Sequence, residues 1–188
     1  MKIFVVGMHC SGKQELFEYL EDDGVQCGKL FSNTDVNDIR YEFFTDKDIN
    51  EIFENSAYIF LRNMHNDSDT IEGMSLYEYD NNDVFILSPS QFTAIQGKEL
   101  NKDFCLVWLD NSKATRRTRY VEERRIYNFN QVEQEENTDL DNFIDIVYNN
   151  KKAHLIYFND EDIARVSTVI YSITKYPELI KKFEKTFR

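Results

Sequence analysis

The fold of this chain is decided by the stretch Ile3-Phe4-Val5-Val6-Gly7-Met8-His9-Cys10-Ser11-Gly12-Lys13. A short β-branched and aromatic run leads directly into G-x-x-x-x-G-K, and a segment with helical periodicity follows. This order of strand, glycine loop and helix is the context that a phosphate-binding P-loop requires. Glycines let successive backbone N–H groups converge on one anion, while the helix dipole and the lysine add positive charge.

The loop supplies the candidate contacts to a donor nucleotide: Gly7, Ser11, Gly12, Lys13 and Gln14. Gln14 stands where a P-loop usually has the Ser or Thr that holds magnesium. An amide oxygen can still reach a metal ion or its water shell, so Gln14 is also the candidate metal contact. The alternative is an ordinary glycine turn with a solvated lysine, but glycine is rare here, with 6 in 188 residues.

Composition favours one folded protein with a sizeable core. Hydrophobic residues make up 41% of the chain, which includes 15 Phe and 11 Tyr. The net charge of −12 argues against binding to nucleic-acid polymers or to anionic membranes, because polyanions would be repelled. A nucleotide enzyme with this charge must gather its cations locally, and the densest basic run is Arg116-Arg117-Thr118-Arg119, followed by Arg124-Arg125.

The cysteines and the apolar segments bear on the compartment. Cys10, Cys27 and Cys105 are far apart and have no metal-binding spacing, which is typical of a reducing cytosol. No apolar run is long enough to cross a membrane, and no secretory pattern is present. We therefore expect a cytoplasmic protein. The Asn-, Asp- and Lys-rich composition is typical of an AT-rich genome, and one hypothesis is a virus-encoded protein that acts in the host cytoplasm.

Strands alternate with helical segments along the chain, which predicts an α/β fold with a parallel sheet covered on both faces. Thr45 and Asp48 have the spacing of a helix N-cap and its partner, and residues 75–79 are compatible with a helix or a loop. The expected strands cover 2–6, 57–61, 83–88, 104–109 and 154–158, with extended pieces at 25–31 and 38–44, and the expected helices cover 13–20, 45–53, 112–126, 139–149 and 160–174.

The order of these motifs resembles that of guanylate kinases over nearly the whole chain. Beyond the P-loop, the similar stretches are Ile39–Phe44 with the helix after it, Ala57–Phe60, Glu72-Gly73-Met74-Ser75, Asn111-Ser112-Lys113 leading to Arg119-Tyr120 and Arg124, and Ile156–Asp160. The resemblance implies a P-loop NTPase three-layer fold with a central parallel sheet in a single domain, 1–188. Its core would cover about 1–31 and 83–188, a nucleoside-monophosphate-binding insertion about 32–82, and a helical lid about 112–138.

The resemblance also implies an activity, the transfer of the γ-phosphoryl group from ATP, with Mg²⁺, to a (deoxy)nucleoside monophosphate. Phosphoryl transfer needs positioning and charge neutralisation more than covalent chemistry. The candidate catalytic residues are Lys13, Arg119 and Arg124, and Asn159 is a further candidate donor contact. A homodimer is a further hypothesis. The candidate acceptor contacts are Ser32, Thr34, Arg40 and Tyr41.

Several positions differ from the family pattern. Ser32-Asn33-Thr34-Asp35 replaces the stretch that carries two phosphate-clamping arginines, and Phe60 stands where a Glu reads guanine. Because a phenylalanine cannot accept hydrogen bonds from guanine, the acceptor could be another nucleotide or an unusual one. Two further alternatives remain open. The chain could be a guanylate-kinase-like module that binds without turnover, and the basic run could be a solvated face that pairs with Glu122 and Glu123.

Overall fold

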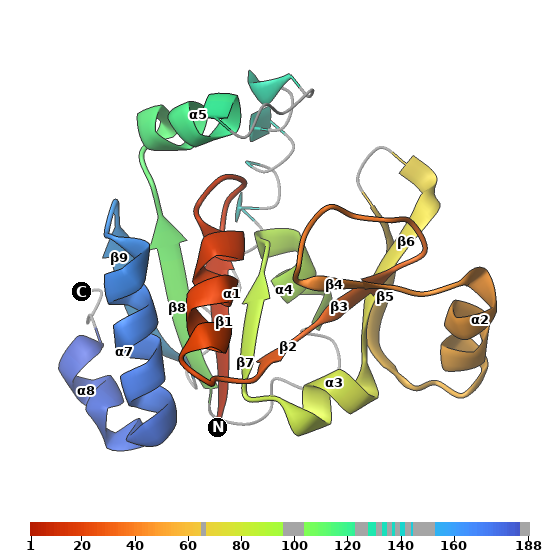
Figure 1. Ribbon diagram of the computed structural model, residues 1–188, viewed down its shortest axis with the longest axis horizontal. Helices are drawn as coiled ribbons and strands as arrows, with labels where there is room; N and C mark the ends of the chain where they lie inside the picture. Colours follow the sequence, from red (N-terminus) through yellow and green to blue (C-terminus); the bar gives the residue numbers. More distant parts are fainter. Residues whose placement is uncertain are drawn as a thin grey trace.

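The centre of the protein is a sheet of parallel strands in the order β2-β7-β1-β8-β9 (Figure 1). The computed structural model describes residues 1–64, 67–95, 104–122, 128–130, 133–134, 137, 140–141, 144 and 153–184. The strands are β1 (Lys2–Gly7), β2 (Cys27–Gly28), β7 (Val84–Leu87), β8 (Phe104–Asp110) and β9 (Ala153–Asn159). Each pair is parallel, as expected for continuous apolar runs joined by helices.

Helices cover both faces of this sheet, which confirms the predicted α/β architecture. Successive strand residues point to opposite faces. Ile3 and Val5 therefore pack against α1 (Lys13–Asp22) and α7 (Ile163–Lys175). Phe4 and Val6 belong to a second buried cluster, which includes Phe92 of α4 (Pro89–Ile95).

A second sheet lies beside the first and has the order β4-β3-β6-β5. Its strands are β3 (Leu30–Ser32), β4 (Tyr41–Phe43), β5 (Tyr58–Met64) and β6 (Asp67–Ser75). β3 pairs with β4 in parallel, and the β5–β6 and β3–β6 pairs are antiparallel. The same stretch of the chain also forms the helices α2 (Asp46–Glu54), between β4 and β5, and α3 (Leu76–Asn81), directly after β6. Apart from β3, which begins at Leu30, these elements fall in the stretch predicted as an insertion at about 32–82, and the domain boundaries themselves stay a prediction.

Side-chain caps explain where several helices begin. Thr45 and Asp48 form the predicted reciprocal capping box at α2. Ser75 accepts a hydrogen bond from the Glu78 N–H, so the ambiguous segment after it is a helix. The prediction of a helix from residue 160 was wrong by three residues. Asp160 has a φ of 47°, and Asp162 caps α7 instead.

Other differences concern elements that lack a clear local pattern. β6 and α4 were not predicted, and the extended piece at 38–44 is a strand only over β4. The described part of the helix expected at 112–126 is α5 (Lys113–Glu122), and residues 123–127 lie outside the described part. Of the helix expected at 139–149, only residues 140, 141 and 144 are described, and they are helical.

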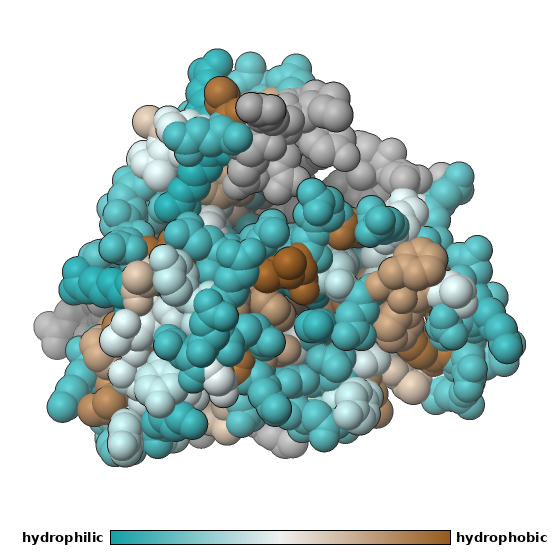
Figure 2. Space-filling view, in the orientation of Figure 1, coloured by the Kyte–Doolittle hydropathy of each residue, from teal (hydrophilic) through white to brown (hydrophobic). Residues whose placement is uncertain are grey.

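The segment after Pro177 packs on the first sheet. A 3₁₀ turn, η1 (Pro177–Leu179), leads into α8 (Ile180–Phe183), and Ile180 is buried in the cluster under α7. Figure 2 shows a mainly hydrophilic face on which hydrophobic residues are exposed in small groups. Among the described residues, no helix is long and apolar enough to span a membrane.

Candidate nucleotide site

The glycine loop joins the C-terminal end of β1 to the first turn of α1, as the sequence predicted. Gly12 is the N-cap residue of α1 and has a φ of +91°, a left-handed conformation that favours glycine. A Cβ there would lie 2.6 Å from Ile163 Cδ1 and 2.9 Å from Arg119 Nη1. A Cβ at Gly7 would collide with Ser11 Oγ. Both glycines are therefore needed for the close packing of this loop.

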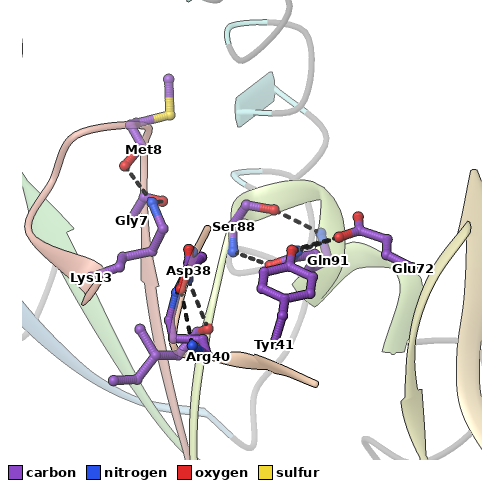
Figure 3. Close-up of polar contacts among 10 residues, drawn as sticks. Gly7, Met8, Lys13, Asp38, Arg40, Tyr41, Glu72, Ser88 and Gln91 are labelled. Carbon is purple, nitrogen blue, oxygen red and sulfur yellow. Dashed lines mark hydrogen bonds and ion pairs between the residues drawn. The ribbon is translucent and has the colours of Figure 1, made fainter. Parts of the chain in front are cut away.

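The loop has the physical properties of an anion site. Gly12 carries no side chain that could cap α1, so the N–H groups of the first helical turn face outward with the positive end of the helix dipole. Lys13 is buried, and its Nζ donates to the carbonyl oxygens of Gly7 and Met8 at 2.9 and 2.6 Å (Figure 3). A full positive charge thus lies against the loop backbone.

Arg119 brings a second positive charge to the loop. Its Nη1 lies 3.5 Å from the carbonyl oxygen of Cys10. Contacts of Cys10 with Tyr120 and Phe129 hold α5 on the loop, and the His9 ring meets Tyr120 edge to face. Lys13 and Arg119 are therefore brought together at the loop. Arg124, the third candidate catalytic residue, lies outside the described residues.

Arg116 has a different environment from Arg119. It is buried, its Nη2 lies 3.3 Å from Glu133 Oε1, and its guanidinium packs over the Phe129 ring. Lys113 pairs with the same carboxylate. The alternative of a solvated face that pairs with Glu122 and Glu123 does not describe Arg116, because Arg116 is buried and its carboxylate partner is Glu133.

Ser11 is buried inside the protein, and its hydroxyl does not face the loop surface. Its Oγ has no hydrogen-bond partner among the described residues, and it lines a small cavity with Leu109, Asn111 and Ile163. Gln14 lies in the first turn of α1 and is partly exposed. Asn159 is exposed at the end of β9, next to Asp110 in the sheet register.

On the second sheet, Arg40 is held by a neighbouring carboxylate. Its Nε lies 3.0 and 3.1 Å from the two oxygens of Asp38, its Nη2 lies 2.5 Å from Oδ2, and its Nη1 donates to the Ile86 carbonyl at 3.2 Å. Burial alone would raise the pKa of Asp38, but the hydrogen bonds and charge of Arg40, together with the charge of Lys13, lower it. The Asp38 carboxylate is therefore stabilised both by Arg40, directly before β4, and by the charge of Lys13 at the loop (Figure 3).

Tyr41 takes part in a second buried network. Its hydroxyl donates to Glu72 Oε2 at 2.6 Å, and Gln91 Nε2 donates to the same oxygen at 2.8 Å. Arg62 binds the other oxygen of Glu72 through Nε at 2.6 Å and Nη2 at 2.5 Å. Burial, followed by the charge of Glu72, raises the pKa of Tyr41 well above its usual value. Gln91 Oε1 accepts from the Ser88 N–H at 2.8 Å, which ties the network to the first sheet.

The remaining predicted acceptor residues also have internal partners. The hydroxyl oxygens of Ser32 and Thr34 lie 3.2 Å apart, and the Thr34 N–H donates to Ser32 Oγ. The structure therefore places Arg40 directly before β4 and Tyr41 at its first residue, and β4 pairs with β3, which ends at Ser32. Sequence reasoning missed Asp38, Glu72 and Gln91 as members of this side. The match of Glu72-Gly73-Met74-Ser75 to a family motif pointed to Glu72 without assigning it a role.

The groups at the loop are better suited to bind a polyphosphate than to hold a metal ion by themselves. The bare N-terminus of α1, Lys13 and Arg119 fit the phosphates of ATP. For Mg²⁺ the predicted contact is the amide of Gln14 alone. Within the described ranges, no group of three His, Cys, Asp or Glu side chains could hold a metal ion.

The strand-loop-helix unit and the parallel sheet define a P-loop protein with a guanylate-kinase-like fold. Among solved structures, the chain is similar to the crystal structure of guanylate kinase from Anaplasma phagocytophilum, with a TM-score of 0.56 and 11% sequence identity. The match covers 99% of this chain and 87% of the other. No protein-family model matches the chain, and no curated protein sequence does. At this identity the likeness establishes the fold, which the sequence resemblance had predicted.

Proposed function

We propose that this protein is an ATP-dependent nucleotide kinase, which transfers the γ-phosphoryl group of ATP to a nucleoside monophosphate or to a nucleoside. One observation carries the proposal: Lys13 and Arg119, from different parts of the chain, both reach carbonyl oxygens of a glycine loop at the bare N-terminus of α1. A helix N-terminus with two cations is suited to a polyphosphate.

Each residue has a defined task in this proposal. The loop N–H groups and Lys13 bind the phosphates of ATP, and Lys13 exchanges its carbonyl partners for phosphate oxygens. Arg119 neutralises the charge that develops on the transferred group, because a loose phosphoryl-transfer transition state is stabilised mainly by positioned cations. Gln14 and Asn159 are proposed donor-side contacts. Ser32, Thr34, Arg40 and Tyr41 are proposed to border the acceptor side.

A second candidate function is a nucleotide-binding module without turnover. Gln14 in place of a hydroxyl residue, and the ion pair that occupies Arg40, both favour it. The two candidates share the donor site and differ only in phosphoryl transfer. ATP binding and ATP consumption must therefore be measured separately.

The test compares thermal unfolding with and without ATP in the wild type, in Lys13→Ala, and in Lys29→Ala as a matched control. Lys29 is a more exposed lysine that pairs with Glu42. ATP at about 100 times its Kd should raise stability by about 2.7 kcal/mol, a Tm shift of roughly 5–10 °C. We expect the shift in the wild type and in Lys29→Ala but not in Lys13→Ala. An equal shift in all three proteins would refute the donor site.

Turnover is measured with a panel of nucleosides and (deoxy)nucleoside monophosphates. Arg119→Ala should lower turnover by several orders of magnitude while changing ATP affinity much less, since a lid arginine acts mainly on the transition state. Equal losses in both quantities would assign Arg119 to binding alone. Stabilisation by ATP without turnover on any acceptor would favour the binding module.

A further inference from the structure

We infer that the acceptor side of this protein excludes a phosphate group, that Glu72 is the residue responsible, and that the acceptor is therefore an uncharged nucleoside. The inference rests on the proposed function, because it assumes that ATP binds at the loop. It narrows the two acceptor classes proposed above to one.

The positive and negative side chains on the proposed acceptor side balance each other in two ion pairs. Arg40, a predicted acceptor residue, and Arg62, which shares the Glu72 carboxylate with Tyr41, are each held by a carboxylate, Asp38 in the first case and Glu72 in the second. The four side chains carry no net charge, and the side chain of Glu72 is only 2% exposed. Arginine recognises a phosphate by directing its N–H groups at the phosphate oxygens. Here these N–H groups are directed at protein carboxylates.

Glu72 also accepts hydrogen bonds from the uncharged donors beside it. Its two oxygens accept from Arg62 Nε and Nη2, from the Tyr41 hydroxyl and from the Gln91 amide. Tyr41 is a predicted acceptor contact, and the proton of its hydroxyl is already donated to Glu72 (Figure 3). A phosphate placed beside Tyr41 would meet a second anion instead of a donor. Juxtaposed like charges are costly, and specific sites use such repulsion to reject the wrong ligand.

The cations at the loop have different hydrogen-bond partners from the arginines on the proposed acceptor side. The described hydrogen bonds of Lys13 and Arg119 go to backbone carbonyls, which are dipoles without a net charge, and the carboxylate that the charge of Lys13 reaches, Asp38, forms its ion pair with Arg40. An incoming phosphate competes with a carbonyl far more easily than with a carboxylate in an ion pair. The two halves of the molecule therefore differ in electrostatic design. The loop favours anions, whereas the Tyr41–Glu72 side disfavours them.

The reaction that follows is a balanced phosphoryl transfer. A hydroxyl oxygen of the nucleoside forms a bond to the γ-phosphorus of ATP, and the bond from that phosphorus to the β,γ-bridging oxygen breaks. ADP keeps the electron pair of the broken bond, and the hydroxyl proton passes to solvent. The product is a nucleoside monophosphate.

The experiment measures binding by calorimetry with a non-hydrolysable ATP analogue already bound. The full chain is titrated with nucleosides and with the matching monophosphates, and turnover is followed with ATP. The variants are Glu72→Gln, which keeps the shape but leaves the cluster with one positive charge, and Arg62→Gln/Glu72→Gln, which restores zero charge. Urea unfolding of each variant confirms that it is folded.

We expect the wild type to bind and phosphorylate at least one nucleoside. It should bind the matching monophosphate with a Kd about tenfold higher or more. Glu72→Gln should bind the monophosphate at least about tenfold more tightly than the wild type does, with a gain that falls as salt is added, and the double variant should lose this gain. If the wild type binds any monophosphate more tightly than the matching nucleoside, or phosphorylates a monophosphate but no nucleoside in the panel, the inference is wrong. The same holds if the single and double variants behave alike. Turnover of neither class would instead count against the proposed kinase activity.

These outcomes are distinct from a failure of the proposed function. If the ATP analogue does not bind to the wild type, the donor site is refuted before any acceptor is added. The preference of the wild type between a nucleoside and its monophosphate tests the inference without a variant, so an unfolded Glu72→Gln protein does not prevent a decision.

Discussion

Gly12→Ala should destabilise this protein more than the same substitution at any exposed glycine. Gly12 has a φ of +91°, where an alanine is strained by its own Cβ. That Cβ would also lie 2.6 Å from Ile163 Cδ1 and 2.9 Å from Arg119 Nη1. The substitution therefore combines a backbone penalty with a packing penalty, and the packing penalty falls on α7 and on a candidate catalytic residue.

Gly24 allows the two penalties to be separated. It has a φ of +76°, but a Cβ there would meet no atom within 4 Å. Gly24→Ala should therefore cost about 1–2 kcal/mol, the backbone strain of a left-handed alanine. Gly12→Ala should cost this and about 1–3 kcal/mol more for overpacking, because Ile163 and Arg119 must move. The expected total is about 2–5 kcal/mol.

Urea unfolding at neutral pH measures both variants against the wild type, and thermal unfolding provides a check. For a chain of this length, about 1 kcal/mol corresponds to a Tm change of roughly 2–4 °C. Gly12→Ala should also lower turnover, since its Cβ displaces Arg119, whereas Gly24→Ala should leave turnover unchanged. Equal destabilisation by the two variants would show that the loop is not packed as described.

Two further predictions concern positions away from the loop. Thr45→Ala removes the hydroxyl that accepts from the Asp48 N–H and donates to the Asp48 carboxylate, while the bond from the residue-45 N–H to Asp48 remains; the change should cost about 1 kcal/mol in urea unfolding, and no loss would mean that the Thr45 hydroxyl contributes nothing to stability. Burial, followed by the hydrogen bond to Asp110, raises the pKa of Tyr157 from 10 to about 12, so the folded protein holds this proton more tightly than the unfolded chain does. The resulting stability is fully present below pH 10 and is lost as the pH rises to about 12, and Tyr157→Phe should remove this part of the decline; parallel curves for the two proteins would contradict it.

Sequence reasoning succeeded where one local rule was enough to define the structure. The apolar runs of β1, β7 and β8 are continuous because these strands are buried on both faces of the parallel sheet, and such runs stand out in the sequence. The loop was equally clear, because its glycines, its lysine and the following helix form one contiguous pattern. Thr45 and Asp48 met the spacing of a cap. In each case the information lies within a few neighbouring residues.

The network around Glu72, on the proposed acceptor side, could not be predicted, because its contacts join distant residues. Glu72 meets Tyr41 across 31 residues and Gln91 across 19, and Arg40 meets the Ile86 carbonyl across 46. Strand β6, which carries Glu72, has acidic and glycine residues that give no alternating apolar pattern. Without that strand, a sequence argument has no means of placing a carboxylate beside Tyr41.

This difference explains why the donor half and the acceptor half of the proposed function rest on different kinds of evidence. A phosphate cradle is a local structure, built from consecutive backbone N–H groups, so a sequence specifies it nearly completely. An acceptor site in this fold is a tertiary structure, in which each donor depends on what a second strand places opposite it. Tyr41 has the residue type of a phosphate donor, and only β6 turns it into a partner of Glu72. The charge opposite a donor, and not the donor alone, therefore determines which acceptor this side can admit.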